Sequence, residues 1–548
     1  MFAIDSPSQR LLACSYSLRS ARKVAMMLGA INRALLSAAD LCPLRARPIS
    51  PVFAGGFLGR GGTPADTIAR LGVLALLGAM ALISMPALAQ ATQLSATAQA
   101  PNKPAIVFVQ AASVKEGDLS ERFPLGSRIV LLERGSRKPT NLTPHFVGAA
   151  DPRVSFDGSR VLFAGKKDAA STWQIWEMNT DGSGQRQVTH SDGNCLAPAY
   201  LPRDAIAFSG QVLASDGSRS YQVFFGNLDG SDVHPITFGP GDYELETVLQ
   251  NGLILASARS PLEPRGKADN SRNLYTLRPD GSGLAAFRCD HEAPAIRSQA
   301  EELEDGSVVF VKNKALEAVP GGDLAAVRRG ATHNSILGPS NSLIWSPRQL
   351  EPERLIVARR ASAPQSAGKF DLYAFDYAHA KLQAPIYQDP QFSSIEPVPV
   401  AAHPAPRWYW STLRPEIKAG YFICLNAALS DDSPQGRLAQ FPAGVRVLAL
   451  DPGTNKENNL GVAPIESDGS FYIAVPPDRP VRFELLDAAG KLMRRQQSWV
   501  WARPGEEHGC VGCHEDRAVT PENRWPLALR RFDAPTSLGV QSPLAASH

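Results

Sequence analysis

Residues 151–189 read DPRVSFDGSRVLFAGKKDAASTWQIWEMNTDGSGQRQVT, and their pattern sets the architecture of most of the chain. Short apolar runs alternate in it with two turns, Asp157-Gly158-Ser159 and Asp181-Gly182-Ser183. Asp-Gly is strong hairpin chemistry, because glycine accepts a positive φ and the aspartate side chain bonds its own backbone. The stretch therefore predicts antiparallel strands joined by tight turns.

The same theme recurs over residues 103–430. Further Asp-Gly-Ser turns begin at Asp229, Asp280 and Asp305. The turns at residues 181, 229 and 280 lie about 50 residues apart, which is the length of a four-stranded blade with its loops. This spacing predicts a six- or seven-bladed β-propeller over residues 103–430.

Residues 436–500 predict a small β-sandwich. Apolar and polar side chains alternate over residues 445–450, 469–475 and 481–486, with the period of a half-buried strand. The remaining residues, 501–548, are too few to fold independently without a covalent or metal staple. The predicted fold class is thus all-β, with a propeller, a sandwich and a short C-terminal segment.

The C-terminal segment contains Cys510-Val511-Gly512-Cys513-His514. Two thiols at this spacing can add to the two vinyl groups of one porphyrin, and the following histidine is then held under the iron. The motif predicts one covalent haem c attached to Cys510 and Cys513, with His514 as the proximal iron ligand. Residues 501–548 are therefore interpreted as a haem-binding segment, which the haem would stabilise.

Two other readings of the motif remain open, a zinc half-site and a redox dithiol. A closed zinc site needs a second Cys/His pair, whereas the segment adds only His508 and His548. A thioredoxin-like pair needs a βαβ context that an all-β chain lacks. The sixth iron position also stays open; His508 is expected to be an exposed loop histidine rather than a ligand.

Five other side chains could either pack in a protein core or contact the haem. Met178 and Met493 lie in apolar strand patterns, so core packing is expected of both. Trp499, Trp501 and Trp525 would either pack on the porphyrin face or fill the core of the sandwich.

An apolar, uncharged run at residues 71–88 leads into Ala87-Leu88-Ala89, whose small residues suit signal-peptidase cleavage after Ala89. Residues 1–89 are thus predicted to be an N-terminal extension with a secretory signal, and the mature protein to be periplasmic or secreted. An uncleaved membrane anchor is the alternative, since about 18 apolar residues is the lower limit for a span. The long stretch before the signal is explained by a start site placed too early, or by a transit peptide.

Composition narrows the class of protein. The chain has 548 residues, 44% of them hydrophobic and 20% charged, which is enough apolar material for several cores. Its formal net charge is +3, with no run of five like charges, so no nucleic-acid partner is expected. The cysteines that follow the predicted signal are scattered except for the motif pair, which excludes a disulfide framework.

The sequence also resembles two known families. Residues 151–189 resemble the repeat of TolB-type propellers. Residues 469–472, 498–500 and 503–515 resemble the middle region of the hydrazine synthase alpha subunit family, and residues 523–531 resemble the tail found in its relatives. That family implies a propeller leading into a β-domain and then a c-type haem.

The departures from this family bear on function. The resemblance implies a tyrosine iron ligand four residues after the motif histidine, where this chain has Ala518. It also implies a second haem-binding domain, whereas these 548 residues contain one Cys-x-x-Cys-His motif. It also implies zinc bound by the motif histidine and a cysteine elsewhere, for which Cys289 and His291 are candidates; buried packing is the favoured reading of Cys289. Hydrazine synthesis itself is therefore not expected.

Three functions remain after these exclusions. The favoured one is a secreted or periplasmic monohaem protein, whose propeller docks a redox partner protein or a small-molecule substrate while the haem transfers electrons or performs a redox step. The second is a non-enzymatic, TolB-like binding propeller. The third is a haem oxidoreductase for a small nitrogen or oxygen compound, which requires an open iron position. A membrane contact is expected only if the signal segment stays uncleaved.

Overall fold

The computed structural model describes residues 104–540 except 214–216, 260–270, 288–294, 315–318, 330, 332, 339–340, 363–367, 431–435, 452–453, 455 and 514–522. The described residues all belong to one compact unit, Pro101–His548. The predicted signal segment at residues 71–88 and its cleavage site after Ala89 lie outside the described residues. Within the described ranges, no helix has the length and apolar character needed to cross a membrane.

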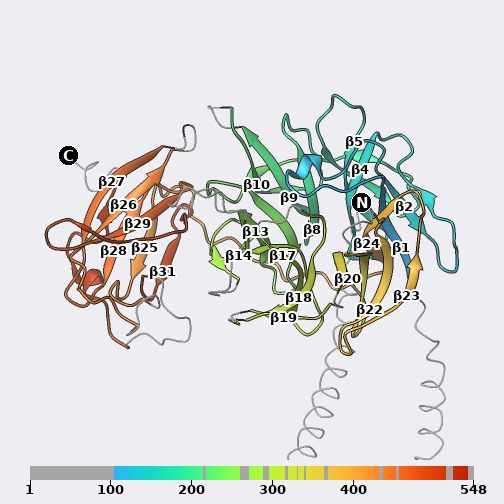
Figure 1. The fold of residues 1–548 in the computed structure, drawn as a ribbon. Coiled ribbons are helices and arrows are strands. Elements are labelled where there is room, and N and C mark those ends of the chain that lie inside the picture. The colour runs from blue at the N-terminus through green and yellow to red at the C-terminus, as the bar shows by residue number, and fades with distance from the viewer. Residues whose placement is uncertain are drawn as a thin grey trace, which may run out of the picture. The chain divides into compact units, whose positions relative to one another are not determined.

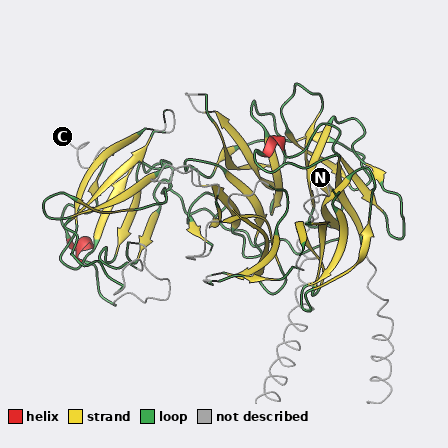
Figure 2. Ribbon diagram, viewed as in Figure 1, coloured by secondary structure: helices red, strands yellow, loops and turns green. Residues whose placement is uncertain are grey.

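The described strands between residues 105 and 400 form six groups of four, antiparallel within each group (Figures 1 and 2). One parallel pairing, Arg272 with Ile296, joins two of these groups into one sheet. The first three groups are β24 (Ser393–Val400), β1 (Ala105–Ala111), β2 (Arg128–Leu132) and β3 (Thr140–Asn141); β4 (Gly148–Val154), β5 (Arg160–Lys166), β6 (Gln174–Asn179) and β7 (Arg186–Gln187); and β8 (Cys195–Leu201), β9 (Ala205–Leu213), β10 (Arg219–Asn227) and β11 (His234–Pro235).

The other three groups follow in chain order. They are β12 (Tyr243–Val248), β13 (Ile254–Arg259), β14 (Arg272–Leu277) and β15 (Ala285–Ala286); β16 (Ala295–Glu302), β17 (Ser307–Lys314), β18 (Asp323–Arg328) and β19 (Ser335–Ile336); and β20 (Ser342–Glu351), β21 (Arg354–Ala361), β22 (Asp371–Asp376) and β23 (Lys381–Tyr387).

The six groups close into a propeller. The first strands of the groups, β4, β8, β12, β16, β20 and β24, contact one another in a closed ring, and we call them the inner strands. The ring closes where β24, from the end of the region, pairs with the N-terminal strand β1. The predicted all-β propeller is thus confirmed, and the described strands supply six blades.

The Asp-Gly-Ser turns adopt the predicted conformation. At all five propeller turns the aspartate side chain accepts a hydrogen bond from the backbone N–H of the serine, at 2.8–3.0 Å. The glycine of each turn has a positive φ. A Cβ at Gly230 would lie 2.4 Å from the carbonyl oxygen of Val188 in the previous blade, and one at Gly281 would lie 2.5 Å from that of Ile236. The glycines therefore also permit neighbouring blades to approach closely.

Each inner strand contains a β-bulge at an equivalent position. At five of the six bulges a residue other than glycine has a φ of 47–56°. These residues are Asp151, Ala197, Gln299, Ser346 and Glu396. Proline follows four of them in the sequence, which suits an irregular strand position where the ladder hydrogen bond is lost.

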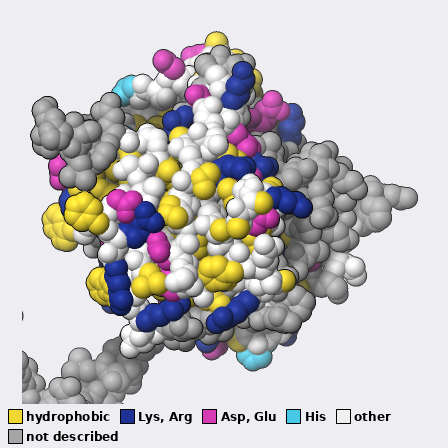
Figure 3. Space-filling model, turned by 90° about the vertical axis from the view of Figure 1, so that its left-hand side faces the viewer, with side chains coloured by type: hydrophobic (Ala, Val, Ile, Leu, Met, Phe, Trp, Pro, Cys, Tyr) yellow, Lys and Arg dark blue, Asp and Glu magenta, His cyan; other side chains and the backbone are white. Residues whose placement is uncertain are grey.

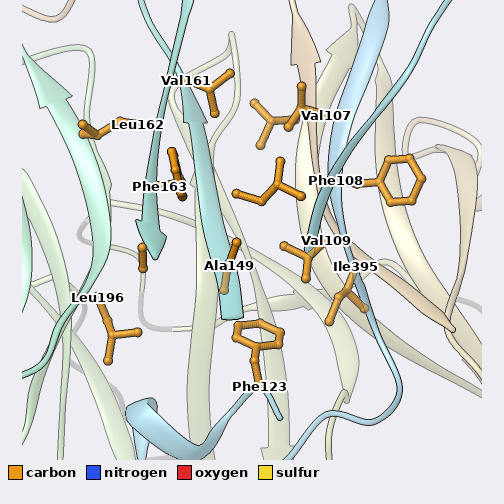
Figure 4. Packing of buried hydrophobic residues seen from close by; sticks show 14 of the residues in the cluster. Val107, Phe108, Val109, Phe123, Ala149, Val161, Leu162, Phe163, Leu196 and Ile395 are labelled. Carbon is orange, nitrogen blue, oxygen red and sulfur yellow. The ribbon is translucent and has the colours of Figure 1, made fainter. Parts of the chain in front are cut away.

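The propeller core lies between the blades. Its largest cluster of buried residues comes from the first three blades and the last one, and includes Met178, which is 1% exposed. Figure 4 shows side chains of this cluster on β1, β4, β5, β8 and β24, with Phe123 contributed by the segment after β1. That segment also contains the 3-10 helix η2 (Leu119–Glu121). The prediction that Met178 packs in a core is confirmed.

The C-terminal domain is a sandwich of two four-stranded sheets. Sheet order is β31-β25-β28-β32 in one and β27-β26-β29-β30 in the other. The elements are β25 (Gly420–Cys424), β26 (Gly444–Leu450), β27 (Glu457–Pro464), β28 (Phe471–Val475), β29 (Val481–Leu486), β30 (Leu492–Arg495), β31 (Glu507–Cys510), the 3-10 helix η3 (Leu527–Arg530) and β32 (Thr536–Ser537).

The sandwich extends beyond the range predicted for it, 436–500. Strand β25 comes from residues predicted to belong to the propeller, and β31 and β32 come from the predicted C-terminal segment. The described part of residues 501–548 is therefore built into the sandwich by strand pairing. Its core is formed by both sheets and includes Phe422, Ile473 and Val447.

Candidate functional site

The two motif cysteines lie at the end of an edge strand of the sandwich. Strand β31 ends at Cys510 and runs parallel to β25, where Cys510 is in register with Cys424. Beyond the strands, the backbone ladder continues: the N–H groups of Leu425 and Asn426 donate to the carbonyls of Cys510 and Val511, each at 2.9 Å. The backbones of the motif and of residues 425–426 therefore hold each other in place.

Cys513 is held by the same neighbouring segment. Its backbone N–H donates to the carbonyl of Leu429 at 3.0 Å. Cys510 and Cys513 are both half-buried, and both pack against the hydrophobic core of the sandwich. Two thiols thus stand close together in the chain, at an apolar surface that solvent can reach. His514 lies outside the described residues.

A turn and the C-terminal tail support residues 425–429. A Cβ at Gly469 would lie 2.2 Å from the Oδ1 atom of Asn426, and Gly469 has a φ of +87°. The carboxylate of Asp468 accepts from the N–H groups of Ser470 at 3.0 Å and Leu527 at 2.9 Å. Burial opposes ionisation of Asp468, but these hydrogen bonds outweigh it and lower the pKa of its carboxyl group. Leu527 of the C-terminal tail is therefore hydrogen-bonded to the Asp468-Gly469 turn, and this turn contacts Asn426, which bonds the motif.

His508 corrects one expectation from the sequence. It is part of β31 rather than of an exposed loop, and 19% of its side chain is exposed. Its ring centroid lies 5.3 Å from that of Phe422, and its Nδ1 lies 3.9 Å from a carboxylate oxygen of Glu506. Strand pairing with β25 draws this histidine onto the sheet, which residue spacing alone did not indicate.

Three other candidate residues differ in how deeply they are buried. Met493 packs against the sandwich core, as predicted. Trp499 is 5% exposed. The guanidinium carbon of Arg482 lies 4.8 Å from the centroid of its ring. Trp525 is 63% exposed.

Figure 3 shows that the face of the sandwich turned to the viewer carries acidic, basic and apolar side chains intermixed.

Trp501 packs against the propeller, a contact that the sequence did not reveal. It is 1% exposed, and its indole N–H donates to the carbonyl of Gly281 at 3.2 Å. Its ring meets those of Tyr243 and Phe238 edge-on, at centroid distances of 5.6 and 6.0 Å. Five residues later, Glu506 accepts from the N–H of Gly283 at 2.7 Å. The strand that leads to the motif thus begins at a contact with the propeller.

The candidate zinc ligands Cys289 and His291 lie outside the described residues, as does Ala518. Within the ranges that the structure describes, no three His, Cys, Asp or Glu side chains are grouped so as to hold a metal ion. The motif cysteines are therefore the chemically distinctive pair among the described residues of the sandwich.

Comparison with known proteins supports the resemblance seen in the sequence. Residues 433–515 match the family model described as the hydrazine synthase alpha subunit middle domain, and this range includes the motif. Hydrazine synthase subunit alpha of Kuenenia stuttgartiensis is 24% identical, over 75% of this chain and 65% of its own length. This chain thus spans slightly less than two thirds of that relative.

One solved structure points to the same fold. The Kuenenia stuttgartiensis hydrazine synthase structure matches with a TM-score of 0.69 and 23% identity, over 78% of this chain and 71% of that one. TolB from Acinetobacter baumannii matches with a TM-score of 0.36 and 13% identity, over 54% of this chain and 67% of its own. The predicted relation to the hydrazine synthase alpha subunit is confirmed.

Proposed function

We propose that this relative of the hydrazine synthase alpha subunit is a monohaem c-type protein that works in the periplasm or is secreted. Cys510 and Cys513 would hold the haem through thioether bonds, and His514 would be the proximal iron ligand. The observation that carries the proposal is the placement of both thiols, half-buried at the apolar edge of the sandwich, inside the segment that matches the family model.

The residues present fit such a group. Haem is a large apolar macrocycle, and the two cysteines pack against the sandwich core while keeping part of their surface exposed. Three backbone hydrogen bonds between residues 425–429 and the motif hold the backbone around both cysteines. Two thiols with this spacing suit addition to two vinyl groups.

The chain's own residues have separate tasks in this proposal. When bound, the haem supplies a one-electron couple at its iron. The pairing of β31 with β25 orients the cysteines, and the buried side chains behind them exclude water from that side. Trp501 and Glu506 join the motif's strand to the propeller. The propeller would serve as the docking platform for a redox partner protein or a small-molecule substrate.

A second candidate function follows from the name of the relative, a synthase subunit. In this reading the chain is a haem enzyme for a small nitrogen or oxygen compound, or a subunit of one, and the iron has an open position. The name also favours a protein partner, because a subunit acts in an assembly. Export through the predicted signal at residues 71–88 would place either function outside the cytoplasm.

The test is a pyridine haemochrome spectrum on chain produced with cytochrome c maturation, before and after acid-acetone extraction. One unextractable haem per chain is expected for the wild type, and none for Cys510→Ala combined with Cys513→Ala. Cys195→Ala is the matched control, because Cys195 is a buried propeller cysteine, 1% exposed. Absence of covalent haem in the wild type would overturn the proposal.

The same preparation separates the two candidate functions. A six-coordinate iron in both oxidation states favours electron transfer, whereas a five-coordinate iron that binds added small ligands favours an enzyme.

A further inference from the structure

The bulges of the inner strands carry buried carboxyl groups that link successive blades. Glu396 accepts from the backbone N–H of Asp151 at 2.8 Å, and the carboxylate of Asp151 accepts from that of Ala197 at 2.7 Å. Glu246 accepts from the N–H of Ala300 at 3.0 Å. These bonds run from β24 to β4, from β4 to β8 and from β12 to β16. Acidic side chains therefore surround the propeller axis at the level of the bulges.

On the side of the bulges nearer the start of the inner strands, the charges are paired. Glu244, two residues before Glu246, binds the guanidinium groups of Arg122 and Arg272, the latter at 2.5 Å. Burial opposes ionisation of Glu244, but the two arginines outweigh it and lower the pKa of its carboxyl group. On this side of the bulges, Arg122 and Arg272 are therefore both ion-paired with Glu244.

On the other side of the bulges, the pairing is incomplete. Arg153 and Arg348 each lie two residues after a bulge residue, and Arg348 binds Glu301 at 3.1 Å. Arg153 donates to the carbonyl oxygens of Pro152 at 3.2 Å and Glu246 at 3.3 Å. Among the described residues, no carboxylate oxygen lies within 4.0 Å of its guanidinium. Its bond to Glu246 crosses from the second blade to the fourth, so the group reaches toward the propeller axis.

The electrostatics show that Arg153 is poorly compensated. Burial, and next the positive charge of Arg348, lower the pKa of Arg153 to about 10, so the guanidinium remains protonated at pH 7. Burial, and next the negative charge of Asp151, raise the pKa of Glu396 to about 8. Glu396 is therefore largely neutral at pH 7 and offers Arg153 little countercharge. The carboxylates of Glu301 and Asp151 also favour the charged form of Arg153, but burial and the charge of Arg348 outweigh them.

We propose that Arg153 and Arg348 form a binding site for a small oxyanion, such as a carboxylate or a phosphate group, at this end of the propeller axis. A guanidinium presents planar N–H donors that match two oxygens of one anion, and such charge-assisted bonds are about twice as strong as neutral ones. Arg153 is half-buried, whereas Arg348 is only 5% exposed, so an anion would approach from solvent on the side of Arg153.

The proposed site lies on the face from which the chain leaves the propeller. Residues 401–410 run along this face, where the N–H of His403 donates to the carbonyl of Phe156 at 2.9 Å and that of Arg407 to the carbonyl of Gln250 at 3.0 Å. Phe156 follows Arg153 by three residues in the loop after β4. A bound anion would therefore lie near the segment that connects the propeller to the sandwich.

Calorimetric titration of the full-length mature chain with inorganic phosphate tests the proposal. Phosphate is added at constant ionic strength, with chloride as the balancing anion. The wild type should bind one phosphate per chain. Arg153→Gln should bind at least about tenfold more weakly, because one charge-assisted contact is lost. Arg219→Gln is the matched control: Arg219 is an exposed arginine at the start of β10, and its loss removes the same charge.

A second measurement keeps the test decisive if Arg153→Gln folds poorly. Phenylglyoxal modifies accessible arginines, and peptide mapping of the wild type reports each site. Phosphate should slow modification of Arg153 several-fold while leaving Arg219 unchanged. No stoichiometric phosphate binding by the wild type, equal binding by Arg153→Gln, or equal protection of both arginines would each overturn the proposal.

Discussion

Cys424 lies directly opposite Cys510 in the parallel pairing of β25 with β31. Neighbouring strands are about 4.7–4.9 Å apart, which falls within the range of Cα separations that a disulfide spans, about 4.4–6.8 Å. Register partners in a sheet also point to the same face, and both cysteines belong to or pack against the sandwich core. Under the proposed function, Cys424 is thus a thiol that would compete with haem attachment at Cys510.

The first prediction concerns this pair. Chain that is exported without cytochrome c maturation should form a Cys424–Cys510 disulfide under a dithiol-oxidising system, and Cys424→Ala should abolish it. Non-reducing peptide mapping detects the linked peptides. With maturation present, Cys424→Ala should retain or increase the haem content. Recovery of only Cys510–Cys513 linked peptides would contradict the prediction.

The second prediction concerns the turn behind the motif. Gly469→Ala should lower the free energy of unfolding by about 1–3 kcal/mol, because the new Cβ would meet Asn426 and the residue would keep a positive φ. Chemical denaturation measures the loss. Gly490→Ala is the matched control, since Gly490 has a φ of +78° but nothing within 4 Å of the added Cβ. Equal losses in both variants would mean that the contact with Asn426 is unimportant.

The third prediction follows from the pKa of Glu396, which burial raises to about 8 in the folded chain. Between the ordinary glutamate range and pH 8, the folded chain keeps this proton while the unfolded chain releases it. The contribution of Glu396 is therefore fully present at low pH and is lost as pH rises toward 8.

Glu396→Gln removes this titration, so its unfolding free energy should fall less than that of the wild type between pH 5 and pH 8. The difference is on the order of 1.4 kcal/mol for each unit by which the pKa is raised. Denaturation midpoints across this pH range measure it. Glu133→Gln, at an exposed position, should keep the wild-type pH profile. Parallel profiles for Glu396→Gln and the wild type would refute the assignment.

The fourth prediction concerns the contact between sandwich and propeller. Trp501→Ala removes a fully buried indole and its hydrogen bond to Gly281, at a cost of about 3–5 kcal/mol. Calorimetry should then resolve separate transitions for the two domains. Trp499→Ala, which empties a site within the sandwich, should instead lower the sandwich transition alone. A single unchanged transition in Trp501→Ala would show that the contact does not couple the domains.

The local parts of this structure could be predicted from the sequence because short-range chemistry determines them. Aspartate and glycine at Asp157-Gly158 and its repeats specify the turn within four residues, so strand direction and blade length follow from their spacing. The spacing of the two cysteines and the histidine in residues 510–514 predicts haem attachment, which stays a prediction. The sequence also contains a signal for the bulges of the inner strands that the sequence analysis missed. Proline follows the bulge residue at four of them, Asp151, Ala197, Ser346 and Glu396.

Which distant segments meet depends instead on the folded chain as a whole. β25 and β31 pair although most of the sandwich lies between them in the chain: β25 contributes Phe422 and Cys424 to the sandwich core, and β31 packs Cys510 against that core. The same pairing draws His508 onto the sheet. Trp501 leaves the sandwich core for the propeller because its ring and its N–H both find partners there. Arg153, in the second blade, reaches the carbonyl of Glu246, in the fourth, only because the blades close into a ring. Local chemistry thus determined the units, and burial of surface between remote segments determined their arrangement.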